Sequence, residues 1–388
     1  MQFRVSRAGA LSLALMIAPF SFDDAVAQIA VSANDNKAVL VDGANTVPAN
    51  PAPDTVTIID LNASPPKLLG EINVPASVVG PPSSVAVAPD ESFAIVTAAT
   101  KLDPADPKKT VPDNKVSIID LKASPPALLA TVEAGAGAAG VAINRAGDLV
   151  LVANRSEGSV SAFTVSGKTL TPAGKVQLGD AKSGPSAVSF SPDGKTALVT
   201  RDGDHKISVL SIDGSKVEHA KRDLHAGLRP YPLGITRDGG YAVIANIGVG
   251  GGDADTMSLL DLKARPARVV DTVSVGQTPE GLAVSPDGNH VVVTVMNGSN
   301  KSAKSPFFND FGLAKIYRIG ESKLIPVTEA KVGHWCQGAA WSKDSKTILV
   351  QCMVEKELQI LTFDGKELKP AGAIKVNGGP SGIHVAGQ

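Results

Sequence analysis

Residues 184–213, GPSAVSFSPDGKTALVTRDGDHKISVLSID, decide how this sequence folds. They contain two runs in which apolar and polar residues alternate, joined by residues 191–195, and a third such run that ends at Asp213. Alternation with a period of two, bounded by Pro, Asp and Gly, is typical of half-buried antiparallel strands joined by tight turns. We therefore interpret this stretch as a strand meander.

The same unit of strand, turn and strand recurs along the chain. Its central turn falls at seven positions spaced 45 to 57 residues apart: Asn34, Asp90, Ala146, Asp193, Asp238, Asp287 and Asp344. Third and fourth apolar runs follow in most units, as in VSIIDL (116–121) and LLATVEA (128–134). Seven units of four strands predict an all-β protein, a seven-bladed β-propeller that occupies residues 28–388 as one domain.

The last segment, GPSGIHVA (379–386), is a lone first strand that follows the seventh unit. We expect it to return to the first blade and to close the ring, which removes an exposed sheet edge. Residues 29–32 have the same pattern, and we interpret 29–41 as the first two strands of unit one. The sequence leaves open which chain end supplies the first strand of that blade.

Composition and the N-terminus indicate an exported protein. The chain has 388 residues, 43% of them hydrophobic, and a formal net charge of −1 without a basic block, so nucleic-acid binding is not expected. Arg4 and Arg7, an apolar run at 8–20 and an A-x-A sequence at 25–27 predict a signal peptide over residues 1–27, cleaved before Gln28. We expect a periplasmic or secreted monomer without a membrane span.

The SPDG-type turns, the following strands of the form ALVT and the third strands that end in IIDL resemble the YVTN-repeat, WD40-like family of seven-bladed propellers. The resemblance covers nearly all of residues 28–388 and implies the fold. It does not imply one activity, because related propellers serve as scaffolds, hydrolases, lactonases and quinoprotein subunits.

Lactonase-type propellers carry an SNRG-x-x-S-I motif in blade three, and ANRSEGSV (153–160) is similar to it at Asn154 and Arg155. In blade four they carry an arginine-histidine pair after Gly-Pro, whereas Ser186 and Ala187 follow Gly184 and Pro185 here. The missing histidine means that the resemblance does not carry lactonase activity over to this chain.

Four connections between second and third strands are long, and a meander places all of them on one face of the propeller, called the loop face below: 42–55, 98–115, 247–256 and 297–313. Long loops on a rigid scaffold are the usual seat of binding; tolerated surface insertion is the alternative. Segment 98–115 reads as a solvated excursion. Asp253 and Asp255 are a weak calcium candidate, with a flexible loop as the alternative. For the phenylalanines at 307, 308 and 311 three interpretations are open: they cap a central pocket, they contact a partner, or they fold back onto a neighbouring blade.

Several unusual side chains lie where blades are linked or where second strands end, near the expected channel mouth. An arginine, a histidine and an acid that converge there suit an anionic or lactone ligand, while local ion pairs such as Arg201–Asp202 are the alternative. The ligand-binding candidates are Asn154, Arg155, Arg201, Arg229, Tyr231, Asn246, His334 and Trp335, and the catalytic set, if the protein is an enzyme, is Arg155, Glu157, Arg229 and His334.

Cys336 and Cys352 lie at equal distances from Asp344, so they are expected to face each other across a hairpin. In an exported protein this favours a disulfide over two buried thiols.

The sequence has no haem-attachment, zinc-protease, nucleophile-elbow or P-loop motif. It favours a binding or interaction scaffold for a small molecule, glycan or protein on the loop face, without a cofactor. A lactonase-like hydrolase is the first alternative, and a subunit of a periplasmic redox complex is the second.

Overall fold

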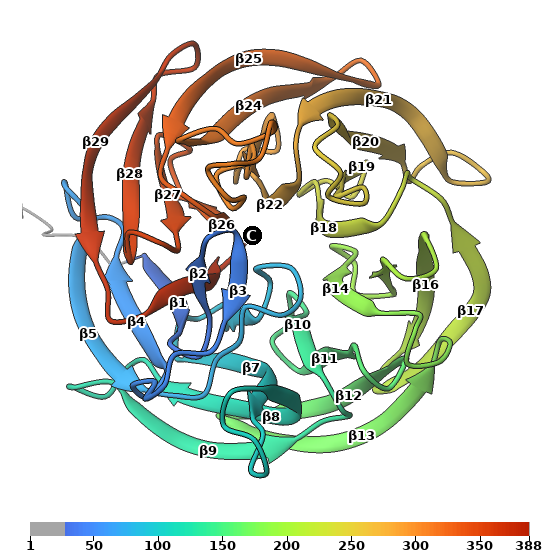
Figure 1. The fold of residues 1–388 in the computed structure, drawn as a ribbon. Helices are drawn as coiled ribbons and strands as arrows, with labels where there is room; N and C mark the ends of the chain where they lie inside the picture. Colours follow the sequence, from blue (N-terminus) through green and yellow to red (C-terminus); the bar gives the residue numbers. More distant parts are fainter. Residues whose placement is uncertain (1–27, 388) are drawn as a thin grey trace, which may run out of the picture.

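The computed structural model describes residues 28–387, and the regular structure of this part is entirely β-strand. Seven four-stranded antiparallel sheets stand around a central axis as the blades of a propeller (Figure 1). The predicted fold class is therefore confirmed. The predicted signal peptide, residues 1–27, lies outside the described residues.

Each blade has four strands, which follow one another outward from the axis. Blade one consists of β30 (Gly379–Val385), β1 (Ile29–Asp35), β4 (Thr55–Asp60) and β5 (Lys67–Asn73). Blade two consists of β6 (Val85–Val87), β7 (Phe93–Leu102), β8 (Thr110–Asp120) and β9 (Ala127–Glu133). Blade three consists of β10 (Ala138–Ile143), β11 (Leu149–Asn154), β12 (Ser159–Ser166) and β13 (Thr169–Gln177). Blades four and five are β14 (Pro185–Phe190), β15 (Thr196–Arg201), β16 (Lys206–Asp213), β17 (Lys216–Leu224); and β18 (Pro230–Ile235), β19 (Tyr241–Asn246), β20 (Asp255–Asp261), β21 (Arg268–Gly276). Blades six and seven are β22 (Pro279–Val284), β23 (His290–Val295), β24 (Gly312–Gly320), β25 (Lys323–Val332); and β26 (Cys336–Trp341), β27 (Thr347–Cys352), β28 (Glu357–Phe363), β29 (Leu368–Lys375).

The C-terminal strand closes the ring, as predicted, and the competition between the two chain ends is resolved. Strand β30 pairs with β1 from Ala30 opposite Val385 to Asp35 opposite Gly379, so β30 is the innermost strand of blade one. The reading of 29–41 as two strands around Asn34 was wrong. Ile29–Asp35 is one continuous strand, the second of its blade, because both of its edges are already paired with β30 and β4.

The long connections also differ from the prediction in their bounds. In blade one the connection runs over 36–54 and contains a hairpin, β2 (Val39–Val41) and β3 (Ala44–Thr46), that reaches toward the axis (Figure 1). In blade two, segment 98–115 is an extension of the blade, because β7 and β8 continue as a ladder as far as Leu102 opposite Thr110, and residues 101–112 are exposed or half-buried, in agreement with the predicted solvated segment. Connections 247–254 and 296–311 complete the set.

Three of these connections touch one another over the loop face. Lys301 Nζ donates to the carbonyl of Gly250 at 2.8 Å, and Ser302 Oγ donates to Asp42 Oδ1 at 2.5 Å. Connection 296–311 thus ties blade six to blades five and one. Phe311 folds back onto its own blade, where Lys331 Nζ lies 4.1 Å from its ring centroid, whereas Phe307 stays exposed. The loop face is therefore partly closed by contacts among its own loops.

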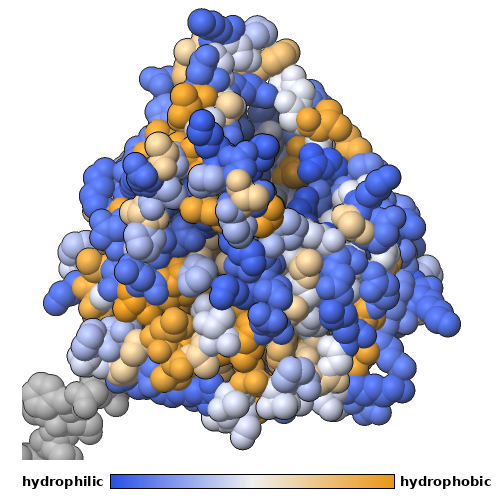
Figure 2. Space-filling model, turned by 60° about the horizontal axis from the view of Figure 1, so that its bottom comes forward, coloured by the Kyte–Doolittle hydropathy of each residue, from blue (hydrophilic) through white to orange (hydrophobic). Residues whose placement is uncertain are grey.

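The core lies between neighbouring blades. Apolar side chains of inner and middle strands pack against the next blade, as Trp341 and Ile316 do between blades six and seven. In the outer strands, exposed and partly buried residues alternate or the whole strand is exposed, and Leu68 and Leu129 are open to solvent. On the side seen in Figure 2, hydrophobic residues are interspersed with hydrophilic ones. Within the described residues, no helix is long and apolar enough to cross a membrane.

Candidate functional site

The linker residue just before each innermost strand adopts the same left-handed backbone conformation in five blades. Glycine fills this position in blades three and four, whereas Arg229, Thr278 and Trp335 fill it in the next three, with φ of 57°, 55° and 49°. A side chain in this region costs roughly 1–2 kcal/mol. The cost of Arg229 suggests that its side chain is needed where it lies.

Arg229 belongs to a cluster that joins blades three, four and five at the loop-face mouth of the channel. Asp202, whose side chain is 3% exposed, accepts a hydrogen bond from Arg229 Nη2 at 2.9 Å and a bidentate pair from Arg155, including Nη2 at 2.9 Å. Ser186 Oγ donates to the same carboxylate at 2.7 Å. Burial acts to raise the pKa of Asp202, but Arg155, Ser186 and Arg229 outweigh it and hold the pKa below its ordinary value of 3.8.

The linker glycine of blade four lets the backbone approach this carboxylate. A Cβ on Gly184 would lie 2.9 Å from Asp202 Oδ1, and its φ is +59°. The close contact requires glycine here, and the left-handed backbone conformation favours it.

A second carboxyl group, Glu280, faces this cluster from the start of β22. It is 7% exposed, and burial raises its pKa to about 8, although Arg155 and Arg229 act to lower it. Tyr231, which is equally buried, lies with its ring centroid 5.7 Å from the Arg155 guanidinium carbon. Glu280 is therefore largely a neutral carboxylic acid at pH 7 and can donate a hydrogen bond.

The pairing register of the innermost and second strands shows that polar side chains of four blades occupy equivalent positions. Ser186, Tyr231, Glu280 and Gln337 each follow the first residue of an innermost strand, the residue that pairs with the end of the second strand. Both side-chain polar atoms of Gln337 are buried and have no hydrogen-bond partner in residues 28–387. Buried polar groups nearly always have partners, so an exception points to a ligand or solvent position.

A small apolar cluster lies on the opposite side of the mouth. Met296, Met353 and Trp335 pack there with Ala38 and Val78 beneath the loops of blades one and six. The predicted ligand residue Trp335 is therefore 7% exposed and part of a small hydrophobic cluster. The polar part of the mouth, formed by blades three to six and by Gln337 of blade seven, is the candidate site.

The structure does not assemble the predicted catalytic set. Arg155 and Arg229 converge, but on Asp202. Glu157 accepts from Lys175 Nζ at 2.6 Å, and His334 lies between Glu355 and Asp310, with Nε2 2.9 Å from Asp310. Burial acts to lower the pKa of His334, and the two carboxylates outweigh it and raise the pKa, so this histidine is a poor base.

Asn154 and Asn246 act as structural braces. Asn154 Nδ2 donates to Ser159 and Ser161 at 2.9 Å, and Asn246 donates to Thr256 and Ser258 at 3.1 Å. Each asparagine thus fixes the second strand of its blade to the third. The local Arg201–Asp202 ion pair, considered above as an alternative, does not form, because Arg201 pairs with Asp204 and Asp202 pairs with Arg155.

The remaining predicted site residues lie away from this cluster. Asp255 accepts from the Thr278 backbone N–H at 2.9 Å, and neither it nor Asp253 belongs to a metal-suited group of His, Cys, Asp and Glu side chains in the described chain. Cys336 and Cys352 do face each other in the β26–β27 register, as predicted, and the structure has both as free thiols.

Sequence reasoning missed Glu280, Gln337 and the central role of Asp202. A signal for Glu280 was present: aligned on the turns, Pro279-Glu280-Gly281 falls on Pro185-Ser186-Ala187 and Pro230-Tyr231-Pro232. That alignment places Glu280 beside Tyr231, which the sequence had already singled out.

Comparisons with known proteins agree with this architecture. The family described as "Lactonase, 7-bladed beta-propeller" matches residues 113–227, which contain Arg155, Ser186 and Asp202. A putative 6-phosphogluconolactonase from Bacteroides fragilis superposes with a TM-score of 0.71 over 95% of this chain and 99% of its own. The fold is that of the lactonase-like seven-bladed propellers.

Two further solved structures show how widely this propeller fold is used. The periplasmic gluconolactonase of Pseudomonas aeruginosa has a TM-score of 0.64, covering 92% of this chain and 98% of its own, and a hydrazine synthase chain of Kuenenia stuttgartiensis has 0.62, covering 80% and 91%. Identities are 17%, 16% and 18% for the three structures, so the likeness establishes the fold alone. No curated protein matches the chain.

Proposed function

We propose that this propeller binds a small oxygen-rich molecule of the sugar-acid kind at the polar part of its loop-face mouth. The observation that carries the proposal is a pair of buried polar groups at equivalent positions of neighbouring blades: the neutral carboxyl group of Glu280, which faces the Arg155–Asp202–Arg229 cluster, and the unpartnered side-chain amide of Gln337 in blade seven. Arginine suits a carboxylate, and the acid, the amide and the Tyr231 hydroxyl suit several hydroxyls.

Lactone hydrolysis is the second candidate, and one observation favours it. With its pKa raised to about 8, Glu280 is partly ionised near neutral pH, and its carboxylate form is then a stronger base toward water than an ordinary carboxylate. Arg155 and Arg229 lie where they would stabilise the oxyanion that forms on the lactone carbonyl. Two of the similar solved structures are named as lactonases, which is a reason to test this reaction but does not assign it to this chain.

Binding of D-gluconate, measured by titration calorimetry, tests the first candidate. Arg229→Gly is expected to weaken binding by about tenfold or more, because a charge-assisted contact is lost, while glycine suits the left-handed backbone at this position. Thr278→Gly, at the equivalent position of blade six, is the matched control and should bind normally. Absence of gluconate binding to the unmodified protein would refute the proposal.

The same preparation tests the second candidate with D-glucono-1,5-lactone. Turnover above the spontaneous rate that disappears in Glu280→Gln would make the protein a lactonase rather than a binding protein. Equal, uncatalysed hydrolysis in both proteins is the result we expect.

We further propose that the protein is exported and that Cys336 and Cys352 form a disulfide there. The two residues face each other across the hairpin, and a hydrogen bond with Cys352, together with burial, raises the pKa of Cys336. Non-reducing peptide mapping of protein from a periplasmic fraction should find the two peptides linked, and protein made without residues 1–27 in a reducing cytoplasm should not show the link. Free thiols in the exported protein would contradict this proposal.

A further inference from the structure

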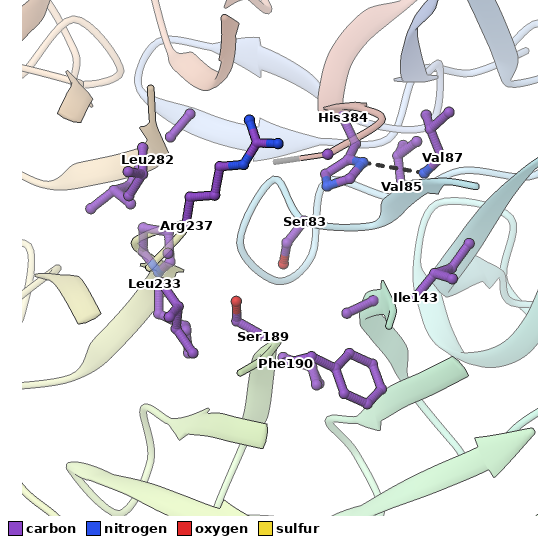
Figure 3. Close-up of a pocket in the computed structure, with 18 of the residues that line it drawn as sticks. Ser83, Val85, Val87, Ile143, Ser189, Phe190, Leu233, Arg237, Leu282 and His384 are labelled. Carbon is purple, nitrogen blue, oxygen red and sulfur yellow. Dashed lines mark hydrogen bonds between the residues drawn. The ribbon is translucent and has the colours of Figure 1, made fainter. Parts of the chain in front are cut away.

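The central channel contains a cavity on the side of the short turns between first and second strands, called the turn face below. Its volume is about 230 Å³, and innermost strands of all seven blades line it. Ile143, Phe190, Leu233 and Leu282 supply apolar walls (Figure 3). None of Glu280, Arg155 and Asp202 of the loop-face site lines this cavity.

Polar groups of the cavity point into it. The Ser83 hydroxyl is buried and has no hydrogen-bond partner among residues 28–387. Figure 3 shows this hydroxyl and that of Ser189 turned toward the middle of the pocket. His384 accepts a hydrogen bond at Nδ1 from the Val87 backbone N–H at 3.2 Å, so its neutral ring carries the proton on Nε2.

Two cationic side chains line the mouth of the cavity. Arg145 and Arg237 come from the turns of blades three and five, and neither forms an ion pair or hydrogen bond with a described residue. In Figure 3 the Arg237 side chain extends over the pocket in the direction of His384. The residues of the described chain that line the cavity include no Asp or Glu.

The acidic residues of these two turns are already engaged. Asp148 Oδ1 accepts from Asn144 Nδ2 at 2.7 Å, and Asp238 accepts from Thr236 at 2.7 Å and from Lys263 at 2.9 Å. Within these two turns, the guanidinium groups are therefore the charges that remain available to a ligand.

We propose that this cavity binds a small organic monocarboxylate with a compact apolar body. The carboxylate lies between Arg145 and Arg237, whose planar guanidinium groups match it. The body packs against Phe190 and the aliphatic walls, and Ser83 meets a polar edge. The volume is below the roughly 300–1,000 Å³ typical of drug-sized ligands, which restricts the ligand to a single ring or a short branched chain.

Benzoate and its neutral analogue benzamide are the probes, titrated into the full chain and followed by calorimetry and ligand-observed NMR. Benzoate should bind at millimolar concentration or below, and benzamide about tenfold or more weakly. Arg145→Gln and Arg237→Gln should each weaken benzoate binding by about the same factor. Both arginines are exposed and unpaired in the described chain, so neither variant should impair folding.

Arg222→Gln, at an exposed arginine on the outer strand β17, is the matched control and should bind benzoate normally. No saturable benzoate binding, or binding that Arg145→Gln and Arg237→Gln do not weaken, overturns the proposal. Equal affinity for benzoate and benzamide overturns it as well.

Discussion

Replacing Asp202 with asparagine is expected to lower the free energy of unfolding by about 3 kcal/mol. The carboxylate neutralises two arginines from two other blades and accepts from Ser186, and its side chain is 3% exposed. An amide presents one acceptor oxygen and no charge. Arg155 and Arg229 would then repel each other in a partly buried site. Urea unfolding followed by circular dichroism measures this loss of free energy. The m-value, which is the slope of the free energy of unfolding against urea concentration, should not change if only the stability is altered.

Two further variants separate this effect from general damage. Glu218→Gln removes one partner of an exposed pair with Lys216, whose side chains are 60% and 69% exposed, and should cost less than about 0.5 kcal/mol. Combining Asp202→Asn with Arg155→Gln should cost less than the sum of the two single changes, because the isolated arginine is gone. A loss below about 1 kcal/mol in Asp202→Asn would show that solvent already compensates these charges.

The propeller itself was predictable because each blade repeats a local signal. Period-two alternation and Asp-Gly turns recur in register, so errors in one unit are corrected by the others. The exception was blade one. Ile29–Asp35 and Gly379–Val385 have the same alternation, and only pairing between the two chain ends decides that the first is a second strand.

The site was less predictable because its contacts join different blades. Arg155 and Asp202 are 47 residues apart in sequence and meet only when blades three and four stand side by side. From the sequence, a local pair of Asp202 with its neighbour Arg201 was the alternative. In the structure β15 ends at Arg201, which pairs with Asp204, and the turn that follows directs Asp202 to Arg155.

His334 shows the opposite error. It was selected because a histidine near a channel mouth is the usual general base. In the structure two carboxylates surround it, and they stabilise its charged form. Its neighbour Asp310 comes from a long loop whose path the sequence does not specify, so this pairing had no signal in the chain.

Glu280→Gln is expected to remove a pH dependence of stability that the unmodified protein shows between pH 5 and pH 8. Burial raises the pKa of Glu280 from 4.5 to about 8, so in this interval the folded protein holds a proton that the unfolded chain has released. The stabilisation of the folded state by this bound proton is complete below pH 4.5 and is lost as the pH rises through 8. Its size over the interval is on the order of 3 kcal/mol.

The measured quantity is the free energy of unfolding of the unmodified protein minus that of Glu280→Gln, across this pH range. The difference should fall steadily toward pH 8, because all other titrating groups are common to both proteins. Glu157→Gln is the control: Lys175 outweighs the effect of burial and lowers the pKa of Glu157, so that carboxylate is ionised throughout and its difference should stay flat. A flat difference for Glu280 would mean that its carboxyl group is ionised and solvated in the native state, and the loop-face mouth would then be an open, wet channel rather than a dry polar site.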